Sequence, residues 1–447
     1  MNQVGRIMPV RIFIAALMAL AFAACAAPAA GPAPVTSLNA AVAPVTDADA
    51  ARLAELYRRQ DCFGLRDALA GMQGGAVVDF YRAAAAVAFN RPDEAITELR
   101  RFLASPEAAA DPARRQSAYE LLGDAYVRTF RYAEAAEVYA ALAGEASADS
   151  SGRENAANVR GLWGALAGTP AQTVEAPGPV RLTTTRDRAN LVNVRVESGG
   201  QSMDFVYDTG ANLSTVTAST AREMGFRVLS DSVRVGSSTG GNSYARVAVA
   251  PELRIGGATV RNAAFLVFPD SALSFPQINY QIRGIIGFPV IAGFGATTLT
   301  RGGELVLGDT ADAGAEGEQN LCLRGLMPLV AAEHAGERLH FGFDTGAQTT
   351  ALYPPFHAAR REAVEAGGEP STVQVGGAGG MRQVQAYTLS PLVLRIGGRQ
   401  ATVPQVRVYV EPTSSDSDRF YGNIGQDVIR QFEAMTLDFR RMQLRFR

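Results

Sequence analysis

The strongest constraint on the fold is a short string that occurs twice in the second half of the chain. "FVYDTGAN" at 205–212 and "FGFDTGAQ" at 341–348 share an Asp-Thr-Gly-Ala core, and Asp208 lies 136 residues before Asp344. Three more pairs keep nearly this spacing: "RVGSSTGG" at 234–241 with "QVGGAGG" at 374–380, "LRIGGATV" at 253–260 with "LRIGGRQA" at 394–401, and "GIIGFPVI" at 284–291 with "GNIGQDVI" at 422–429. Four ordered pairs at an almost constant offset indicate an internal duplication, so the fold must contain two equivalent units.

The residues around these strings have the pattern of short β-strands. Segments such as "ANLVNVRVES" at 189–198 and "RVAVAPELRI" at 246–255 alternate or run apolar, with Gly, Asn or Ser residues between them. We therefore expect an all-β region with pseudo-twofold symmetry, divided into a first lobe at 180–310 and a second lobe at 320–447.

A helical region precedes the β region, at 47–170. Apolar residues recur there at three- and four-residue spacing, in segments that include "AVVDFYRAAAAVAF", "PDEAITELRRFLA" and "RRQSAYELLGDAYVRTF". Two helical hairpins can be overlaid, and the second, which contains "RYAEAAEVYAALA" at 131–143, resembles a tetratricopeptide repeat. Two interpretations stay open: a groove that binds a protein partner, or a spacer that caps the β region.

The first 46 residues read as an export signal and a tether. Arg6 and Arg11 precede an apolar run of 13 residues from Ile12 to Ala24, whereas a membrane span needs roughly 20 residues. We therefore expect a signal peptide at 1–24 and an Ala- and Pro-rich tether at 25–46. Small residues before Cys25 resemble a bacterial lipoprotein cleavage site, which implies a periplasm-facing protein anchored to a membrane through lipidated Cys25. An ordinary signal peptide with an incidental Cys25 is the alternative.

Charge and cysteine content exclude some function classes. The formal net charge is −2, so no strong field attracts nucleic acid, and we expect no nucleic-acid partner. Beside Cys25 the chain has Cys62 and Cys322, which form either a disulfide or two buried thiols. The sequence contains no CxxC string and no Cys/His cluster, so we expect no metal site and no cofactor.

Two equivalent aspartates have a chemical use that one aspartate lacks. A single Asp-Thr-Gly string reads as a turn at a strand end, where Gly permits a close backbone approach. A pseudo-twofold axis can instead bring Asp208 and Asp344 face to face. Two carboxylates about 3 Å apart cannot both ionise, so they share one proton. The ionised group can then activate a water while the protonated group polarises a peptide carbonyl.

With these residues, the region 180–447 resembles the aspartic peptidases, and more narrowly their bacterial retropepsin-like families. "DTGANLSTVTASTAREMGF" at 208–226 has their Asp-Thr-Gly-Ala, the Ser and Thr residues that follow, and a short helix. The resemblance implies a bilobal fold with Asp208 and Asp344 as the catalytic pair. Retroviral members use two identical chains, but both halves lie in this chain, so we expect a monomer.

The resemblance also implies which residues support the catalytic pair and which cover the substrate. The support residues are Thr209, Gly210, Ala211, Thr345, Gly346, Ala347, Ile285, Ile286, Gly287, Ile424 and Gly425. Two Gly-rich hairpins match substrate-covering flaps, through Gly236, Gly240, Gly241, Gly376, Gly377, Gly379 and Gly380. Asn423 departs from the apolar residue expected beside Ile424, which weakens the expected support of the second Asp-bearing loop.

Taken together, the sequence predicts an exported aspartic endopeptidase that cleaves polypeptides bound in an extended conformation. The helical region would offer a surface for a protein partner. The competing interpretation is a lipoprotein scaffold that binds peptides in a degenerate protease fold without cutting them. The distance between the two carboxyl groups discriminates between the two interpretations, because only the peptidase requires them to face each other.

Overall fold

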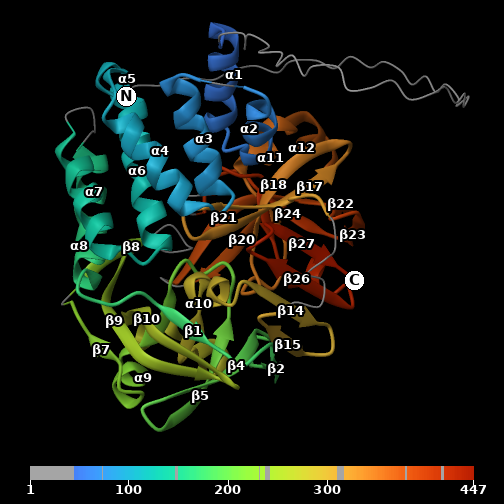
Figure 1. Ribbon diagram of the computed structural model, residues 1–447. Helices are drawn as coiled ribbons and strands as arrows, with labels where there is room; N and C mark the ends of the chain where they lie inside the picture. Colours follow the sequence, from blue (N-terminus) through green and yellow to red (C-terminus); the bar gives the residue numbers. More distant parts are fainter. Residues whose placement is uncertain are drawn as a thin grey trace, which may run out of the picture. The chain divides into compact units, whose positions relative to one another are not determined.

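The computed structural model (Figure 1) describes residues 45–72, 74–145, 150–230, 232–236, 242–309, 317–377, 380–413 and 417–447. All of these residues belong to one compact unit, Pro44–Arg447. The predicted signal peptide, Cys25 and nearly all of the tether lie outside the described residues. The predicted boundaries between domains remain predictions, because Pro44–Arg447 is not divided further.

The helical region consists of antiparallel helices with clear start signals. Its members are α1 (Asp47–Arg58), α2 (Cys62–Leu69), α3 (Ala76–Ala88), α4 (Pro92–Leu103), α5 (Pro106–Ala110), α6 (Pro112–Arg128), α7 (Tyr132–Gly144) and α8 (Ser150–Leu166). Thr46 forms a capping box with Asp49 at the start of α1. Proline occupies the first position of α4 and of α6, where its missing N–H costs no hydrogen bond.

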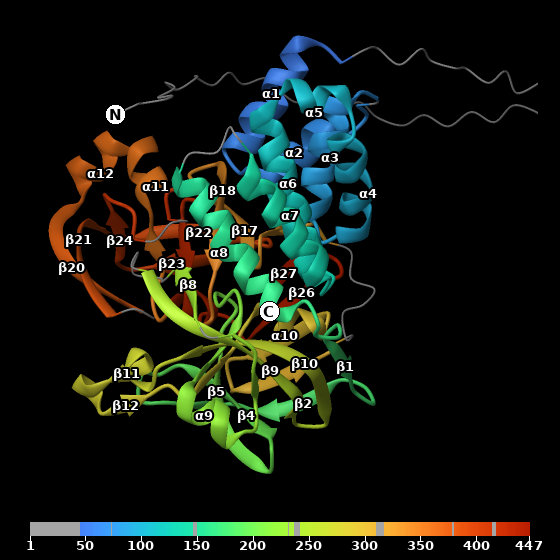
Figure 2. The same cartoon turned by 90° about the vertical axis from the view of Figure 1, so that its left-hand side faces the viewer.

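Close helix packing depends on small residues in this region. Figure 2 shows α6, α7 and α8 side by side. A Cβ atom at Gly123 in α6 would lie 2.6 Å from the ring of Tyr139 in α7, so glycine lets the two helices approach. The helical character of this region is confirmed, whereas its likeness to tetratricopeptide repeats stays a prediction. Among the described residues, no helix has both the length and the apolar character needed to cross a membrane.

In the described part of the chain, the first half of the β region forms a ten-stranded sheet ordered β1-β10-β6-β13-β5-β4-β9-β7, with β3 on β4 and β8 on β9. The strands are β1 (Thr173–Glu175), β3 (Thr185–Arg186), β4 (Val192–Ser198), β5 (Gln201–Tyr207), β6 (Ser214–Thr217), β7 (Arg227–Val228), β8 (Val233–Gly236), β9 (Asn242–Ile255), β10 (Ala258–Phe268) and β13 (Gly284–Ile286). The short helices α9 (Ala218–Glu223) and α10 (Phe288–Gly293) and the two-stranded sheet of β11 (Ser274–Phe275) and β12 (Tyr280–Gln281) complete this half.

The described part of the second half forms another ten-stranded sheet, ordered β20-β21-β24-β19-β25-β18-β17-β22-β23, with β16 on β17. Its strands are β16 (Leu321–Arg324), β17 (Met327–His334), β18 (Glu337–Phe343), β19 (Ala351–Leu352), β20 (Glu369–Gly377), β21 (Gly380–Leu389), β22 (Leu392–Ile396), β23 (Arg399–Val403), β24 (Val406–Tyr409) and β25 (Gly422–Ile424). Its helices are α11 (Pro354–Ala359), α12 (Arg361–Gly367) and α13 (Gln426–Ile429).

The two sheets share the same central arrangement. The order β10-β6-β13-β5-β4-β9 in the first half matches β24-β19-β25-β18-β17-β22 in the second. Strand β13 runs parallel to β5 and antiparallel to β6, and β25 runs parallel to β18 and antiparallel to β19. The fold class is therefore confirmed: a helical region is followed by a β-rich region whose arrangement is consistent with an aspartic-protease-like fold.

A third sheet joins the two halves. It is ordered β2-β15-β14-β26-β27, with strands β2 (Val180–Thr183), β14 (Ala296–Thr300), β15 (Glu304–Leu307), β26 (Ala434–Asp438) and β27 (Gln443–Phe446). Strand β14 of the first half pairs antiparallel with β26 of the second half. The hydroxyls of Thr298 and Thr436 hydrogen-bond across this pair at 2.8 Å. The backbone hydrogen bonds of one sheet therefore fix the halves together.

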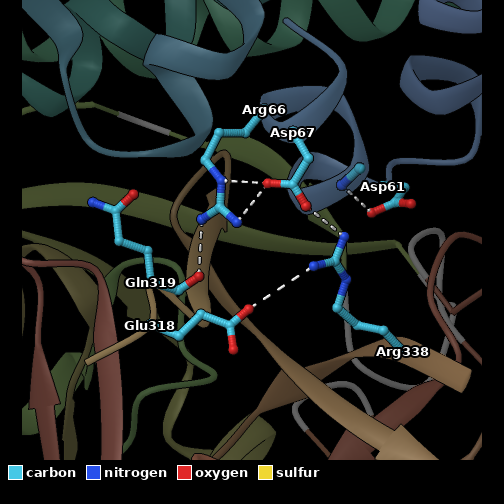
Figure 3. A network of polar contacts seen from close by, with 7 residues as sticks. Asp61, Arg66, Asp67, Glu318, Gln319 and Arg338 are labelled. Carbon is cyan, nitrogen blue, oxygen red and sulfur yellow. Dashed lines mark hydrogen bonds and ion pairs between the residues drawn. The ribbon is translucent and has the colours of Figure 1, made fainter. Parts of the chain in front are cut away.

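A disulfide attaches the helical region to the second half. Cys62 at the start of α2 is bonded to Cys322 in β16, which decides between the two interpretations that the sequence left open. Figure 3 shows polar contacts between the same two regions, in which Arg66 donates to the backbone oxygen of Gln319 at 3.0 Å and Arg338 donates to Asp67 at 2.9 Å. Exposed ion pairs contribute at most about 1 kcal/mol each, so the disulfide is the stronger tie at roughly 2–5 kcal/mol.

Candidate active site

Each Asp-bearing loop follows a buried strand and is fixed at its first residue. The residues before Asp208 and Asp344 are aromatic and fully buried, Tyr207 and Phe343, both 1% exposed. The backbone N–H of Asp208 donates to the carbonyl of Ile286, and that of Asp344 donates to the carbonyl of Ile424, both at 3.0 Å. The apolar residues predicted to support the loops thus hold them through the backbone.

The glycines that follow these apolar residues allow close packing against the loops. A Cβ atom at Gly287 would lie 2.7 Å from the backbone oxygen of Ala211, and one at Gly425 would lie 2.8 Å from that of Ala347. Neither position has room for a side chain. The Gly287–Ala211 and Gly425–Ala347 contacts therefore occur at equivalent places in both halves, and all four residues belong to the predicted support set.

Two threonines tie the loops to each other. Thr209 Oγ1 donates to the backbone oxygen of Phe343 at 2.8 Å, and Thr345 Oγ1 donates to that of Tyr207 at 2.8 Å. Each hydroxyl also accepts from the other threonine's backbone N–H, at 3.1 and 3.0 Å respectively. Both threonines are buried, so these four bonds lie in an environment where an unmade hydrogen bond is costly.

The loops bring the two carboxyl groups together. A Cβ atom at Gly210 would lie 2.5 Å from the carboxyl carbon of Asp344, and a Cβ atom at Gly346 would lie 2.5 Å from that of Asp208. The backbone N–H of Gly210 donates to Asp208 Oδ1 and that of Gly346 donates to Asp344 Oδ1, both at 2.8 Å. Each aspartate therefore lies over the glycine of the opposite loop, and the carboxyls face each other.

Electrostatics keep a proton in this pair. Burial raises the pKa of Asp208 well above its usual range, and the neighbouring Asp344 carboxyl raises it further. The backbone N–H groups of Gly210 and Ala211 oppose this effect in part. As residues, Asp208 and Asp344 are half-buried. The arrangement can hold one acid and one base side by side.

Asn423, which the sequence marked as a departure, contacts the pair directly. Its side-chain amide donates to Asp344 Oδ2 at 2.9 Å. The second loop keeps the strand pairing of the first, since Asn423 pairs with Gly342 in the register that Ile285 and Val206 have in the first half. Sequence reasoning missed this contact, although the joint departure at 342 and 423 from one repeat to the other is a signal that reveals it.

A second layer of side chains braces the second loop. Asp427 accepts hydrogen bonds from the backbone N–H and the hydroxyl of Thr350, the latter at 2.7 Å. The amide of Gln426 donates to the backbone oxygen of Thr345 at 2.9 Å. Both contacts follow directly after Gly425 in the chain. The string "GNIGQDVI" therefore contributes polar support as well as the apolar support that was predicted.

The predicted flaps are hairpins, as far as the structure describes them. Strand β8 pairs with β9 up to Gly236, and β20 pairs with β21 up to Gly377 and Gly380. Gly376 lies in β20, whereas Gly240, Gly241 and Gly379 lie outside the described residues.

Helix α8 holds the edge of β8, because the Asn158 side chain accepts from the backbone N–H of Arg234 at 3.0 Å and donates to its carbonyl. Glu154 adds an ion pair with the Arg234 side chain at 3.0 Å.

A metal site in a protein needs several ligating side chains close together. Within the described ranges, His, Cys, Asp and Glu side chains form no cluster of three or more that is suitable for one.

Comparison with known proteins agrees with this geometry over part of the chain. No curated protein matches the sequence. Residues 192–290 match the family model described as Aspartyl protease. This stretch runs from β4 to α10 and includes Asp208 and Gly287. The chain therefore contains an aspartyl protease family domain, and a helical N-terminal region precedes it.

Proposed function

We propose that this protein is an aspartic endopeptidase that hydrolyses peptide bonds with a water activated by Asp208 and Asp344. The observation that carries the proposal is the facing pair of carboxyls on loops bonded to each other through Thr209 and Thr345. The match of residues 192–290 to the aspartyl protease family supports a polypeptide as the substrate. The match covers Asp208, while the assignment of Asp344 rests on the geometry.

The proposed reaction uses the shared proton. The ionised carboxylate accepts a proton from the water, whose oxygen attacks the peptide carbonyl carbon, and the protonated carboxyl donates its proton to the carbonyl oxygen. The tetrahedral intermediate then collapses as the C–N bond breaks. The carboxyl that accepted the water proton gives it to the nitrogen, and the other carboxylate takes a hydroxyl proton from the intermediate as the product carbonyl forms. The substrate would lie extended between the two halves, with its backbone bonded to the hairpins of β8–β9 and β20–β21.

The alternative, a peptide-binding scaffold without hydrolysis, has less support. That interpretation expects the two carboxyls to lie apart. The carboxyls instead face each other, and Asn423 donates to one of them. These contacts favour the peptidase.

We further propose that the protein is exported and anchored to a bacterial membrane through a lipid on Cys25. The short apolar run and the small residues before Cys25 support this location. The Cys62–Cys322 disulfide supports export independently, because disulfides persist in oxidising compartments such as the periplasm. Mass spectrometry of the mature protein from its native host tests the anchor, which predicts an acylated N-terminal Cys25.

The proposed activity is tested with the chain from Ala26 onward, which keeps every described residue. We would incubate it with a diverse quenched-fluorescent peptide library from pH 3 to 8, beside Asp208→Asn and Asp344→Asn. The proposal expects cleavage by the wild type and a loss of at least about 100-fold in either variant, the scale of general acid–base catalysis. No cleavage by a folded wild-type protein at any of these pH values would reject it in favour of the scaffold.

A further inference from the structure

The immediate surroundings of the two carboxyls differ in one hydrogen-bond donor. Asp208 accepts from the backbone N–H of Gly210 at 2.8 Å, and the backbone N–H of Ala211 also acts on its carboxyl and lowers its pKa. Asp344 accepts from the equivalent groups of Gly346 and Ala347, at 2.8 and 3.0 Å. Asp344 also accepts from the side-chain amide of Asn423 at 2.9 Å.

The third donor reaches the oxygen that the backbone leaves open. The N–H groups of Gly346 and Ala347 bond Asp344 Oδ1, whereas Asn423 bonds Oδ2. In the first half the same register position is Ile285, an alkyl side chain that cannot donate a hydrogen bond. The two carboxyls therefore differ in whether a side chain donates a hydrogen bond to Oδ2, which occurs at Asp344.

The fold provides space for this amide. Asn423 pairs with Gly342, and a Cβ atom at Gly342 would lie 2.5 Å from Asn423 Oδ1. In the first half the residue at this position is Val206, which pairs with Ile285. Glycine at 342, in place of the valine of the first half, thus leaves room for Asn423 at its observed position. The changes from Val206 to Gly342 and from Ile285 to Asn423 therefore belong together.

An amide donor has a definite effect on a carboxyl that shares a proton. A donor stabilises the ionised form of its acceptor, and a hydrogen bond to a charged group is stronger than one to a neutral group. We propose that Asn423 is a positioning residue that keeps Asp344 ionised, so that Asp344 acts as the general base and Asp208 carries the proton. The effect of Asn423 on the rate rests on the proposed peptidase function. The location of the proton on Asp208 does not depend on that function.

The other charged groups near the pair are consistent with this assignment. Asp208 faces Asp344 across the axis, and burial together with that neighbour raises the pKa of Asp208. Asp427 on α13 accepts a hydrogen bond from the hydroxyl of Thr350. Arg186 lies further out, where it donates to Gln426, and Gln426 in turn donates to the backbone of Thr345. Asn423 is therefore the donor that distinguishes the two carboxyls at contact distance.

The inferred step balances without a further reactant. A water proton moves to the Asp344 carboxylate as the water oxygen bonds the carbonyl carbon. The proton held by Asp208 moves to the carbonyl oxygen. Asn423 exchanges no proton, and it influences the reaction through its hydrogen bond to Asp344.

The kinetic test compares the pH dependence of kcat/KM in the full mature chain and in Asn423→Leu, which keeps the size of the side chain but removes the amide. Loss of the donor should move the acidic limb to higher pH by about one unit, since one unit corresponds to one ordinary charged hydrogen bond. Asn423→Asp, which adds a third carboxylate, should move it further in the same direction. Val393→Leu, at an exposed position of β22 in the same half, should leave the limb in place.

A second variant guards against a packing defect. Gly342→Val with Asn423→Ile installs the Val–Ile pair that the first half already contains at 206 and 285, and it should show the same limb shift as Asn423→Leu. An unmoved limb in both variants, with only KM raised, would overturn the proposal, because Asn423 would then line the substrate cleft without acting on Asp344.

A direct readout separates this inference from the proposed function. Carboxyl-carbon NMR of the Asp-labelled protein, with Asp208→Asn and Asp344→Asn to assign the signals, follows the dyad's two titration steps. The first deprotonation should appear at Asp344 in the wild type and should spread over both residues in Asn423→Leu. A first deprotonation at Asp208 overturns the inference. If the wild type cleaves no peptide and yet deprotonates first at Asp344, the proposed function fails while the inference stands.

Discussion

In the first half of the β region, Val206 pairs with Ile285 just before the loop of Asp208. At the same register in the second half, Gly342 pairs with Asn423 just before the loop of Asp344. The backbone plan around these pairs is the same. The duplication therefore preserves the loops, the threonines and the glycines, and it varies the side chain that faces one carboxyl. A symmetric scaffold with one asymmetric donor can distinguish a base from an acid.

The hairpins differ in a comparable way. Strand β8 of the first half is bonded to α8 of the helical region through Asn158 and Glu154. In the second half, β21 of the equivalent hairpin packs against α12 of its own half. The helical region is therefore attached to the second half by a disulfide, and to the first half by the contacts of α8 with β8.

The largest expected effect tests whether the two loops are equivalent. Gly210→Ala places a methyl group 2.5 Å from the carboxyl carbon of Asp344, and Gly346→Ala places one 2.5 Å from that of Asp208. Each change must displace the opposite carboxyl, and a displacement of about 1 Å costs on the order of 100-fold in rate. We expect both variants to lose at least that much in kcat/KM, measured on one cleaved peptide. Near-normal activity in one of them would break the symmetry at the loop itself.

The next effect concerns the stability of the loop connection. Thr209→Val and Thr345→Val keep the side-chain shape but each leaves a buried backbone oxygen and a buried N–H without the partner they have now. We expect each variant to lose about 2–3 kcal/mol of unfolding free energy, the usual cost of orphaned buried groups. Urea unfolding of the two variants side by side measures this. Equal losses support the symmetric connection, and a difference above about 1 kcal/mol contradicts it.

A smaller effect comes from the raised pKa of Asp208. Because the folded state holds this proton more tightly than the unfolded chain, the stabilisation is complete below about pH 4 and is lost as the pH rises through the folded-state value. Asp208→Asn removes that loss, so at pH 7 the free energy of unfolding of the variant should be higher than that of the wild type. At pH 3.5 the two should be nearly equal. Unfolding midpoints across this range give the comparison.

Asp344→Asn sharpens the same measurement. Burial is the larger cause of the raised pKa of Asp208, and the Asp344 carboxyl is the second cause. Removing that carboxyl should therefore reduce the decline of stability with pH without abolishing it. A decline that vanishes completely in Asp344→Asn would assign the whole effect to repulsion between the two carboxyls.

Periodicity and repetition predicted the positions of these features more readily than their contacts. The spacing of the Asp-Thr-Gly-Ala strings placed Asp208 and Asp344 at equivalent loops, because duplicated sequence folds into duplicated structure. The apolar period predicted α3, α4, α6 and α7 within a few residues. These are local patterns, and local patterns suffice for elements with a regular amphipathic face.

Long-range polar contacts could not be predicted in this way. Helix α8 was not singled out, since "SSGRENAANVRGLWGAL" contains three glycines and few large apolar residues. Its partner Arg234 lies 76 residues after Asn158. Asn423 was noticed as an exception to an apolar pattern, but its donation to Asp344 depends on Gly342, 81 residues earlier. Only the assembled sheet shows that the two departures compensate for each other.

The smallest effect tests the attachment of the first hairpin to the helical region. Asn158→Ala removes two hydrogen bonds from the edge of β8, at a partly exposed site where each is worth about 1 kcal/mol or less. We expect KM for a cleaved peptide to rise two- to five-fold, which corresponds to about 0.4–1 kcal/mol, with kcat nearly unchanged. The reason is that a looser hairpin must be ordered when the substrate binds.

Asn155→Ala is the matched control, because Asn155 lies on an exposed face of the same helix. It should leave KM unchanged, and both variants should keep the wild-type unfolding midpoint within about 1 kcal/mol. An equal KM in the two variants would mean that α8 contacts the hairpin without influencing it. The helical region would then be connected to substrate binding through the second half, where the Cys62–Cys322 disulfide holds it.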